Sequence, residues 1–395
     1  MKLPLGGVRV LTVEQYGAGP FGTQYLADQG AEVIKIESPS MGGDYARAVG
    51  PHFFADEHSQ FFHSFNRNKK SLSLDISKPE GKEVFHELVT TADAVTSNAR
   101  GDVPARLGIT YEELGAINPK IVCAHLSAYG REGSRANWPG FDYLMQAETG
   151  YFALTGEPES PPTRMGLSIV DLMTGLGLAY SVAIGVLSAR ETGMGRDMDI
   201  SLFDTALFNL CYPGTWYLNA GVNQQREPRS GHPSLVPCAL YTTQDGWIYI
   251  MCNKEKFWPA LCDAIERPEW ADDPRFATFA ERLGNRMLLQ DLLDAELTQK
   301  STAEWLEIFA GNVPAAPLND VKSALDNPFV AERGLIQTLD LEGHGDIRLI
   351  DTPIKSGVST PSKPAPTLGE QTDELLDEIG ISAERRVALK ADGVI

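Results

Sequence analysis

The stretch GVRVLTVEQYGAGPFGTQYLADQGAEVIKIE, residues 7–37, decides the fold of the N-terminal half. Two strand-like runs flank a short helical segment, and Gly17, Gly19 and Gly22 fit the spacing G-x-G-x-x-G directly after the first run. Glu37 ends the second run, where the acid of a dinucleotide-binding unit contacts a ribose. Pro20 falls in the expected first turn of the helix and removes an N–H group that could face a pyrophosphate. The segment predicts a Rossmann-type βαβ unit, and Pro20 argues against NAD as its ligand.

Strand and helix patterns continue to alternate through the first half of the chain. We expect further strands at 71–76, 92–98, 121–130 and 196–203, separated by helices. Apolar, β-branched runs with helices between them are typical of a parallel sheet covered on both faces. Thr110 and Glu113 have the spacing of a capping box for a short helix before Asn118.

The character of the sequence changes near residue 225. A hairpin is expected from 237 to 252 around the turn Asp245-Gly246, followed by helices from 254 to 309, with a second capping box at Ser301 and Glu304. The predicted fold class is therefore α/β, with a Rossmann-like large domain at 1–200 and a smaller α+β domain at 225–330. A connector at 201–224 joins them, and the tail 331–395, with a Pro-rich segment at 360–367 and a terminal helix, completes the large domain.

Composition excludes several functional classes. The 395 residues carry 34 basic and 53 acidic side chains, a net charge of −19, which argues against nucleic acid or an anionic membrane as the main partner. The five cysteines are scattered and the seven histidines lack metal-ligand spacing, so we expect buried, reduced thiols and no metal site. The N-terminus shows no apolar or Arg-rich leader, so a cytoplasmic location is expected.

The most apolar long run, residues 172–189, reaches the length of a membrane span. Asp171 at its head and three glycines within it favour a helix buried in a large domain. A carboxylate beside the free N–H groups of a helix N-terminus is held ionised by the dipole and is available as a nucleophile. The same pattern fits an ordinary helix N-cap, and the residues alone leave both interpretations open.

Several segments, in the same order from end to end, resemble the class III CoA-transferases, the family of formyl-CoA transferase, carnitine CoA-transferase and α-methylacyl-CoA racemase. They are residues 18–37, 64–82, 106–122, 140–150, 169–204 and 365–380. The resemblance implies an interlocked homodimer in which two chains thread through each other. It also implies acyl-CoA and a small carboxylic acid as substrates, with no separate cofactor.

The family uses an aspartate at the start of a long apolar helix as its nucleophile, and Asp171 in V-D-x-x-x-G matches it. The implied route runs through a mixed anhydride and an enzyme thioester on that carboxylate, from which the acceptor acid takes the CoA. Asp142 matches an acidic position near the nucleophile. Gly231, in Ser230-Gly231-His232, resembles the loop that covers the active site, and an ordinary turn is equally compatible with those three residues.

The resemblance nominates CoA-binding positions from several parts of the chain: Tyr16, Ala18, Leu74, Asn98, Ala99 and Arg106. Arg106 is the candidate for a CoA phosphate, since its guanidinium is a fixed cation. The sequence departs from family patterns at Ser38, at Ser77 and at Gly17, which is glutamine in formyl-CoA transferase. Lys69 and Lys70 are interpreted as surface cations.

Three other functions fit fewer of these residues than CoA transfer does. An acyl-CoA racemase needs a histidine where this chain has Phe141 and a glutamate near Lys254, although neighbouring Glu255 complicates that comparison. An NAD(P)-dependent oxidoreductase rests on the glycine motif alone. A binding protein without activity would leave Asp171 as a helix cap. CoA transfer explains most of these residues.

Overall fold

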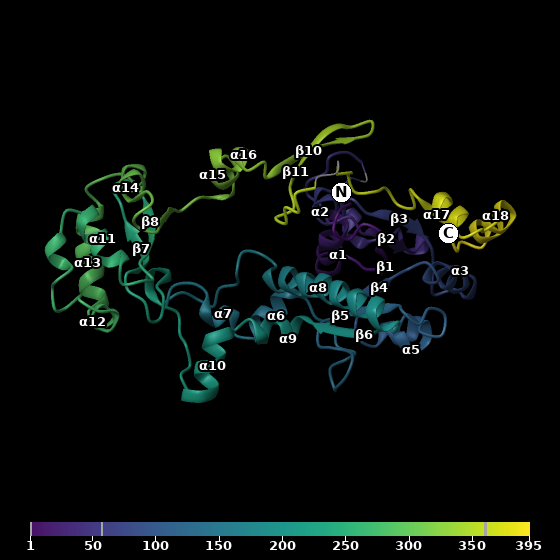
Figure 1. The fold of residues 1–395 in the computed structure, drawn as a ribbon, viewed down its shortest axis with the longest axis horizontal. Helices are drawn as coiled ribbons and strands as arrows, with labels where there is room; N and C mark the ends of the chain where they lie inside the picture. Colours follow the sequence, from purple (N-terminus) through teal and green to yellow (C-terminus); the bar gives the residue numbers. More distant parts are fainter. Residues whose placement is uncertain (1, 57, 359–361) are drawn as a thin grey trace. The chain divides into compact units, whose positions relative to one another are not determined.

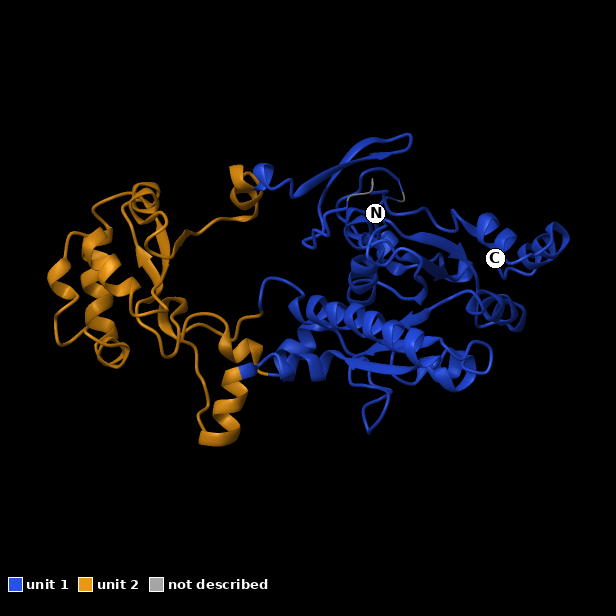
Figure 2. Ribbon diagram, viewed as in Figure 1, with its two compact units in different colours: residues 1–149, 165–211, 330–395 blue, residues 150–164, 212–329 orange. Residues whose placement is uncertain are grey.

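The computed structural model describes residues 2–56, 58–358 and 362–395 (Figure 1). The chain divides into two compact units (Figure 2). The first comprises Met1–Thr149, Met165–Cys211 and Val330–Ile395, and the second comprises Gly150–Arg164 and Tyr212–Phe329.

The first unit is built on a six-stranded parallel sheet in the order β3-β2-β1-β4-β5-β6. The strands are β1 (Arg9–Val13), β2 (Glu32–Glu37), β3 (Lys70–Ser73), β4 (Ala94–Ser97), β5 (Val122–Ser127) and β6 (Arg196–Ser201). This confirms the predicted α/β class with a parallel sheet. The strand order turns back between β1 and β4, and in such sheets ligands bind beyond the carboxyl ends of the strands at that point.

Helices cover the sheet and join its strands. Along the chain they are α1 (Ala18–Asp28), α2 (Gln60–Asn66), α3 (Pro79–Val89), α4 (Val103–Leu107), α5 (Tyr111–Leu114), α6 (Asp142–Glu148), α8 (Ile169–Thr192) and α9 (Leu202–Phe208). Short 3₁₀ helices, η1 (Pro39–Met41) and η2 (Tyr45–Ala48), follow β2. Gly30, with φ of +94°, follows the last turn of α1 and ends it.

The longest helix, α8, packs against the sheet and against α1. Its buried side includes Leu178, Val182 and Val186, and a Cβ built on Gly185 would lie 2.6 Å from Val122 of β5. Among the described residues, α8 is the one helix long and apolar enough to cross a membrane by length and composition. Its contacts with β5 and α1 show that one side of α8 belongs to the core of this unit.

The C-terminal tail completes the first unit. It contains α17 (Thr372–Glu378) and α18 (Ala383–Ala391), and Leu375 and Leu376 join the same apolar core as Leu72 of β3. The sequence patterns predict α17 and miss α18. The tail also contains a separate antiparallel hairpin, β10 (Ile336–Leu341) and β11 (Gly345–Ile350), before α17.

The second unit has its own sheet and core. The antiparallel strands β7 (Cys238–Thr242), β8 (Trp247–Met251) and β9 (Ala315–Pro317) lie in that order and confirm the predicted hairpin. Trp258, Phe276 and Trp305 fill the core beneath the helices. These helices are α11 (Phe257–Ala264), α12 (Phe279–Gly284), α13 (Arg286–Leu297) and α14 (Thr302–Phe309), with α7 (Tyr151–Leu154), α15 (Val321–Leu325), η3 (Pro228–Ser230) and η4 (Pro268–Trp270) as shorter elements.

Several local predictions can be compared with these bounds. Ser301 and Glu304 form the predicted capping box, whereas Thr110 makes no side-chain cap bond and that prediction is wrong. Residues 201–224 are largely helical, with α9 followed by α10 (Cys211–Ala220), and α16 (Pro328–Glu332) lies near residue 330. The Pro-rich segment 360–367 falls partly outside the described residues. None of the five cysteines forms a disulfide, and Cys211 is exposed rather than buried.

Candidate active site

Asp171 lies in the first turn of α8 as its third residue, and the N-cap of that helix is Ser168. The interpretation of Asp171 as the N-cap is therefore wrong. Within the described part of the chain, its side-chain carboxylate accepts no hydrogen bond from protein groups. A carboxylate in a helix's first turn that is not used for capping has its oxygens available for other chemistry.

The carboxylate of Asp171 faces the start of α1. A Cβ built on Gly17, the N-cap of α1, would lie 3.3 Å from Asp171 Oδ2, so the carboxylate is in contact range of bare backbone. The first N–H groups of a helix have no acceptor within the helix. Pro20 has no N–H, which leaves Ala18 and Gly19 as the donors of that turn.

Two glycines allow α1 and α8 to approach this closely. A Cβ on Gly22 would lie 2.3 Å from the carbonyl oxygen of Gly175, and a Cβ on Gly175 would lie 2.4 Å from that of Ala18. A Cβ on Gly19 would lie 2.8 Å from the Asn98 side chain, so this glycine makes room for Asn98. Gly22 and Gly175 therefore serve a helix–helix contact that brings the beginnings of α1 and α8 together.

Asp142, the first residue of α6, holds the main chain beside Asp171. Its Oδ2 atom accepts the Asp171 N–H at 2.9 Å, and its Oδ1 atom accepts a hydrogen bond from Gln146 Nε2 at 2.6 Å. Gln146 also bonds the main chain of Met165 and Leu167, which lead into α8. Gln146 is fully buried, and no sequence pattern singled it out.

Burial and the neighbouring carboxylate of Asp142 change the acidity of Asp171, the candidate nucleophile. Burial, and secondly the negative charge of Asp142, raise the pKa of Asp171 to about 7. The helix dipole favours the ionised carboxylate, whereas burial and the like charge of Asp142 act in the opposite direction and raise its pKa. The side chain can thus gain or lose a proton near neutral pH.

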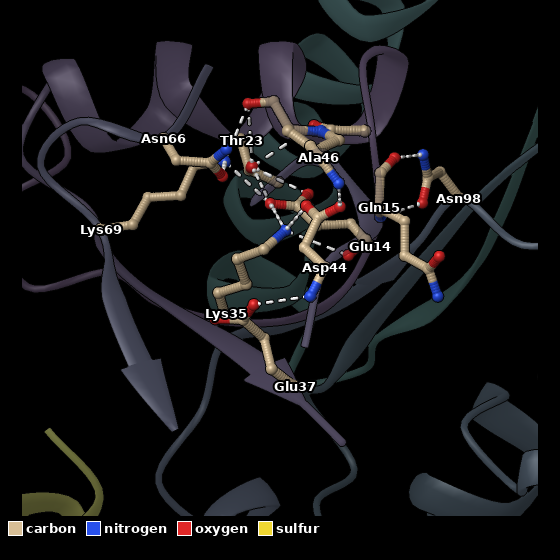
Figure 3. A network of polar contacts seen from close by, with 12 residues as sticks. Glu14, Gln15, Thr23, Lys35, Glu37, Asp44, Ala46, Asn66, Lys69 and Asn98 are labelled. Carbon is tan, nitrogen blue, oxygen red and sulfur yellow. Dashed lines mark hydrogen bonds and ion pairs between the residues drawn. The ribbon is translucent and has the colours of Figure 1, made fainter. Parts of the chain in front are cut away.

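A network of buried charges lies on the other side of the turn between β1 and α1 (Figure 3). Glu14 and Asp44 are its acids, and Lys35 and Lys69 are its bases, all of them at most 5% exposed. The interpretation of Lys69 as a surface cation is wrong, because its ammonium lies 2.8 Å from Glu14 Oε1. Lys70 is partly exposed and pairs with Glu32 and Glu374.

Glu37, the expected ribose contact of a dinucleotide site, is committed within the protein. Its carboxylate pairs with Arg47 at 2.7 Å, accepts the Ser71 hydroxyl at 2.6 Å and accepts the Asp44 N–H at 2.9 Å. With its oxygens satisfied and the side chain buried, Glu37 is not available to a ribose. The interpretation of this position as a ribose-binding acid is wrong.

A family model described as "CoA-transferase family III" matches residues 5–372 of this chain. The chain belongs to CoA-transferase family III. It is 32% identical to the succinate–glutarate CoA-transferase of Agrobacterium fabrum, over 96% of each chain. It is 35% identical to the acetyl-CoA:oxalate CoA-transferase of Acetobacter aceti, over 95% of this chain and 96% of that one. A solved structure of a CAIB/BAIF family protein from Brucella suis is similar, with a TM-score of 0.81 and 31% identity, covering 96% of this chain and all of that one.

Four of the nominated CoA positions in this family III enzyme gather at the carboxyl ends of β1 and β4. Tyr16 follows β1, and Ala18 opens α1 beside Asp171. Asn98, after β4, exchanges two hydrogen bonds with the Gln15 main chain at 2.8 and 2.7 Å, and Ala99 follows it. This is the crevice position that the strand order identifies.

Leu74 and Arg106 lie elsewhere in the same unit. The Leu74 side chain is buried in the core, and its N–H bonds the Glu37 carbonyl at 2.8 Å. Arg106 is exposed on α4 with Asp102 at 3.7 Å. Among the described contacts, none joins either residue to Asp171. Ser38 and Ser77 lie in a small serine–aspartate cluster, in which Asp75 accepts the Ser77 hydroxyl at 2.6 Å.

Gly231 belongs to the second unit. It ends η3 after Arg229 and Ser230, both with positive φ, and its N–H bonds the Pro228 carbonyl at 3.1 Å. His232 accepts two main-chain N–H groups of its own turn, from Ser234 and Leu235, on Nδ1. The loop is thus a strained, internally bonded turn.

The residues that a racemase would use are not suited to proton transfer. Phe141 is 68% exposed and has no titratable group. Glu255 is paired with Arg282 at 2.6 Å and accepts the Phe279 N–H. The named relatives are CoA-transferases, which agrees with these side chains.

The pH dependence of activity should report the Asp171–Asp142 pair. If Asp171 attacks as a carboxylate, kcat/KM for an acyl-CoA donor should rise with pH through about 7 and level off above it. Asp142→Asn removes one of the two causes of the raised pKa, so this limb should move to lower pH. Burial, the larger cause, keeps it above the ordinary range.

The matched control for that experiment is Glu148→Gln on the same helix, whose exposed carboxylate pairs with Arg135. Profiles of kcat/KM between pH 5 and 9 should coincide for this variant and the wild type. A limb that stays in place or moves upward in Asp142→Asn would contradict the coupling.

Proposed function

We propose that this enzyme transfers CoA from an acyl-CoA thioester to a free carboxylic acid through covalent intermediates on Asp171. The observation that carries the proposal is the placement of the Asp171 carboxylate, unbonded by described protein groups, against Gly17 at the N-terminus of α1. The family membership supports CoA transfer, and this geometry supports Asp171 as its nucleophile.

In the proposed route, the ionised Asp171 carboxylate attacks the thioester carbonyl, and the C–S bond breaks to give a mixed anhydride and CoA thiolate. The thiolate then attacks the aspartyl carbonyl and releases the donor acid, which leaves CoA as a thioester on Asp171. The acceptor carboxylate attacks that thioester and forms a new anhydride, and the thiolate returns to the acceptor's carbonyl. Each oxyanion needs donors, and the N–H groups of Ala18 and Gly19 are suitably placed at the start of α1.

The substrates proposed are acyl-CoA esters and short carboxylic acids, dicarboxylates above all. The names of two similar enzymes include succinate, glutarate and oxalate. CoA would be a substrate, with Tyr16, Ala18, Asn98 and Ala99 around its reactive end, and no separate cofactor or metal is needed for the steps above. Among the described residues, no group of three or more His, Cys, Asp or Glu side chains could hold a metal ion.

A transfer and trapping experiment tests this function. The protein is incubated with succinyl-CoA and either glutarate, oxalate or acetate, and the new CoA ester is measured by chromatography. Borohydride or hydroxylamine added during turnover should then modify Asp171, as read by peptide mass spectrometry. CoA transfer without any modification of Asp171 would contradict the covalent route, and absence of transfer to every acid would contradict the substrate class.

We also propose that the protein is an interlocked homodimer in the cytoplasm rather than a membrane protein. The outer side of α8 carries an apolar stripe with helical spacing, Leu176, Tyr180, Ile184 and Leu187, and all four side chains are at least 38% exposed. A second copy of the chain would cover this stripe, because large exposed apolar patches mark interaction surfaces.

An interlocked dimer cannot separate without unfolding. Sedimentation at nanomolar concentration should therefore show a folded dimer, with no dependence on dilution. Tyr180→Glu should impair assembly, whereas Arg106→Glu, on an exposed helix away from the stripe, should not. A folded monomer at nanomolar concentration would contradict interlocking, and flotation of the wild type with lipid vesicles would assign the stripe to a membrane.

A further inference from the structure

The buried charges beneath the turn from β1 to α1 are unusual because they are fully paired and hold main-chain groups of the turn itself (Figure 3). Lys35 and Asp44 are 0% and 2% exposed, and their charged atoms lie 2.7 Å apart. Replacing a buried ion pair by apolar residues is often neutral for stability, so stability alone is a weak reason for such a pair.

Asp44 uses both of its oxygens. While Oδ2 faces the Lys35 ammonium, Oδ1 accepts the N–H of Tyr16 at 3.0 Å and that of Ala46 at 2.8 Å. Lys35 in turn donates to the Glu14 carbonyl at 3.0 Å, two residues before Tyr16. The pair thus forms hydrogen bonds with the main chain at both Glu14 and Tyr16.

The turn from β1 to α1, which this pair holds, is strained. Tyr16 has φ of 68°, the left-handed region that a bulky residue adopts only when its surroundings impose it. The next residue is Gly17, whose backbone lies against Asp171 Oδ2. Further along, Lys69 holds the Pro20 carbonyl at 2.9 Å while it pairs with Glu14, which fixes the first turn of α1 as well.

We propose that Lys35 and Asp44 are positioning residues for the CoA-transfer reaction: they hold Tyr16 in its left-handed conformation and thereby set Gly17 and the N–H groups of α1 against Asp171. The inference rests on the proposed function of Asp171. It assigns a role in the reaction to two residues that touch neither Asp171 nor, by their burial, any substrate.

Two double variants separate the hydrogen bond to Tyr16 from the charges. K35M/D44L removes both charges and the acceptor, whereas K35Q/D44N removes the charges and keeps an oxygen that can accept the Tyr16 N–H. With succinyl-CoA and glutarate, K35M/D44L should lose about 100-fold in kcat, since a shift of about 1 Å at a reacting group costs that much. K35Q/D44N should stay within about fivefold of the wild type, and KM for glutarate should change little in both.

The matched control is the buried pair at the other end of α1, where Arg67 and Asp28 lie 2.6 Å apart and are each 5% exposed. R67M/D28L removes a comparably buried ion pair at the far end of α1. Its thermal stability should change as much as that of K35M/D44L, but its kcat per folded molecule should remain that of the wild type. Should K35M/D44L fail to fold, K35Q/D44S takes its place, because serine retains the cap bond to Ala46 but is too short for Tyr16.

The outcomes are distinguishable from failure of the proposed function. Wild-type protein that neither transfers CoA nor is modified at Asp171 overturns the function itself. Wild-type protein that does both, with equal losses of kcat in K35M/D44L, K35Q/D44N and R67M/D28L, overturns the positioning role alone. A loss confined to variants without the acceptor supports it.

Discussion

Asp171→Asn should lower turnover at least about 1,000-fold, because the covalent route is lost with the nucleophile. The same substitution should make the protein more stable above neutral pH. Wild-type Asp171 has a pKa raised to about 7 by burial and by Asp142, so ionising it costs folding free energy. Asparagine has the same shape and carries no charge.

The sign of the stability change depends on pH. Below about pH 4, Asp171 is protonated in both the folded and unfolded chains, and the variant gains nothing. As pH rises toward 7 the wild type loses stability relative to the variant, and above 7 the difference levels off at about 2–4 kcal/mol. Urea unfolding at pH 4 and pH 8, with CoA transfer assayed on the same samples, measures both effects. Normal turnover in the variant, or an equal stability gain at both pH values, would contradict this account.

Gly175→Ala should damage both stability and activity. Its Cβ would lie 2.4 Å from the Ala18 carbonyl oxygen, and a main-chain atom at that distance can only be relieved by moving α8 away from α1. We expect a loss of about 2–4 kcal/mol in the free energy of unfolding. Since Asp171 lies one turn before Gly175, we also expect turnover to fall about 100-fold.

Gly177→Ala on the same helix is the control. Its Cβ would meet Ile200 at 3.8 Å, an ordinary contact, so alanine should stabilise the helix by up to about 1 kcal/mol and leave turnover unchanged. Urea midpoints and transfer rates of the two variants provide the comparison. Equal behaviour of the two alanines would mean that the contact between α1 and α8 is not tight.

The parallel sheet could be predicted because the sequence patterns that indicate its strands each lie within a few consecutive residues. Short buried runs such as those of β4 and β5 are visible within a few residues of sequence. The hairpin of β7 and β8 follows from its Asp-Gly turn. Bounds were less accurate where a tertiary contact ends the element, as at β3, which stops at Ser73 although the apolar alternation runs on to Ile76.

The environment of the site could not be read in the same way. Asp171 stood out by its place before an apolar helix, but its raised pKa depends on Asp142, 29 residues away, and on burial. The burial of Lys69 depends on Glu14, 55 residues earlier in the chain. The spacing of Gly17, Gly19 and Gly22 predicted a Rossmann-type βαβ unit, but it did not reveal that Gly22 packs against Gly175 of α8. Local sequence patterns can identify such residues, but they do not indicate which distant residues the fold places against them.

The contribution of the last residues to the first unit has a consequence for biosynthesis. Leu375, Leu376 and Val394 belong to the core under β3, and the Val394 carbonyl accepts the Asp75 N–H at 2.7 Å. When β1 to β6 of a growing chain have left the ribosome, Leu72 and Phe85 still lack these packing partners. The sheet therefore reaches its native edge only after residues 375–394 have left the ribosome, and until then the nascent chain exposes apolar surface of the kind that chaperones bind.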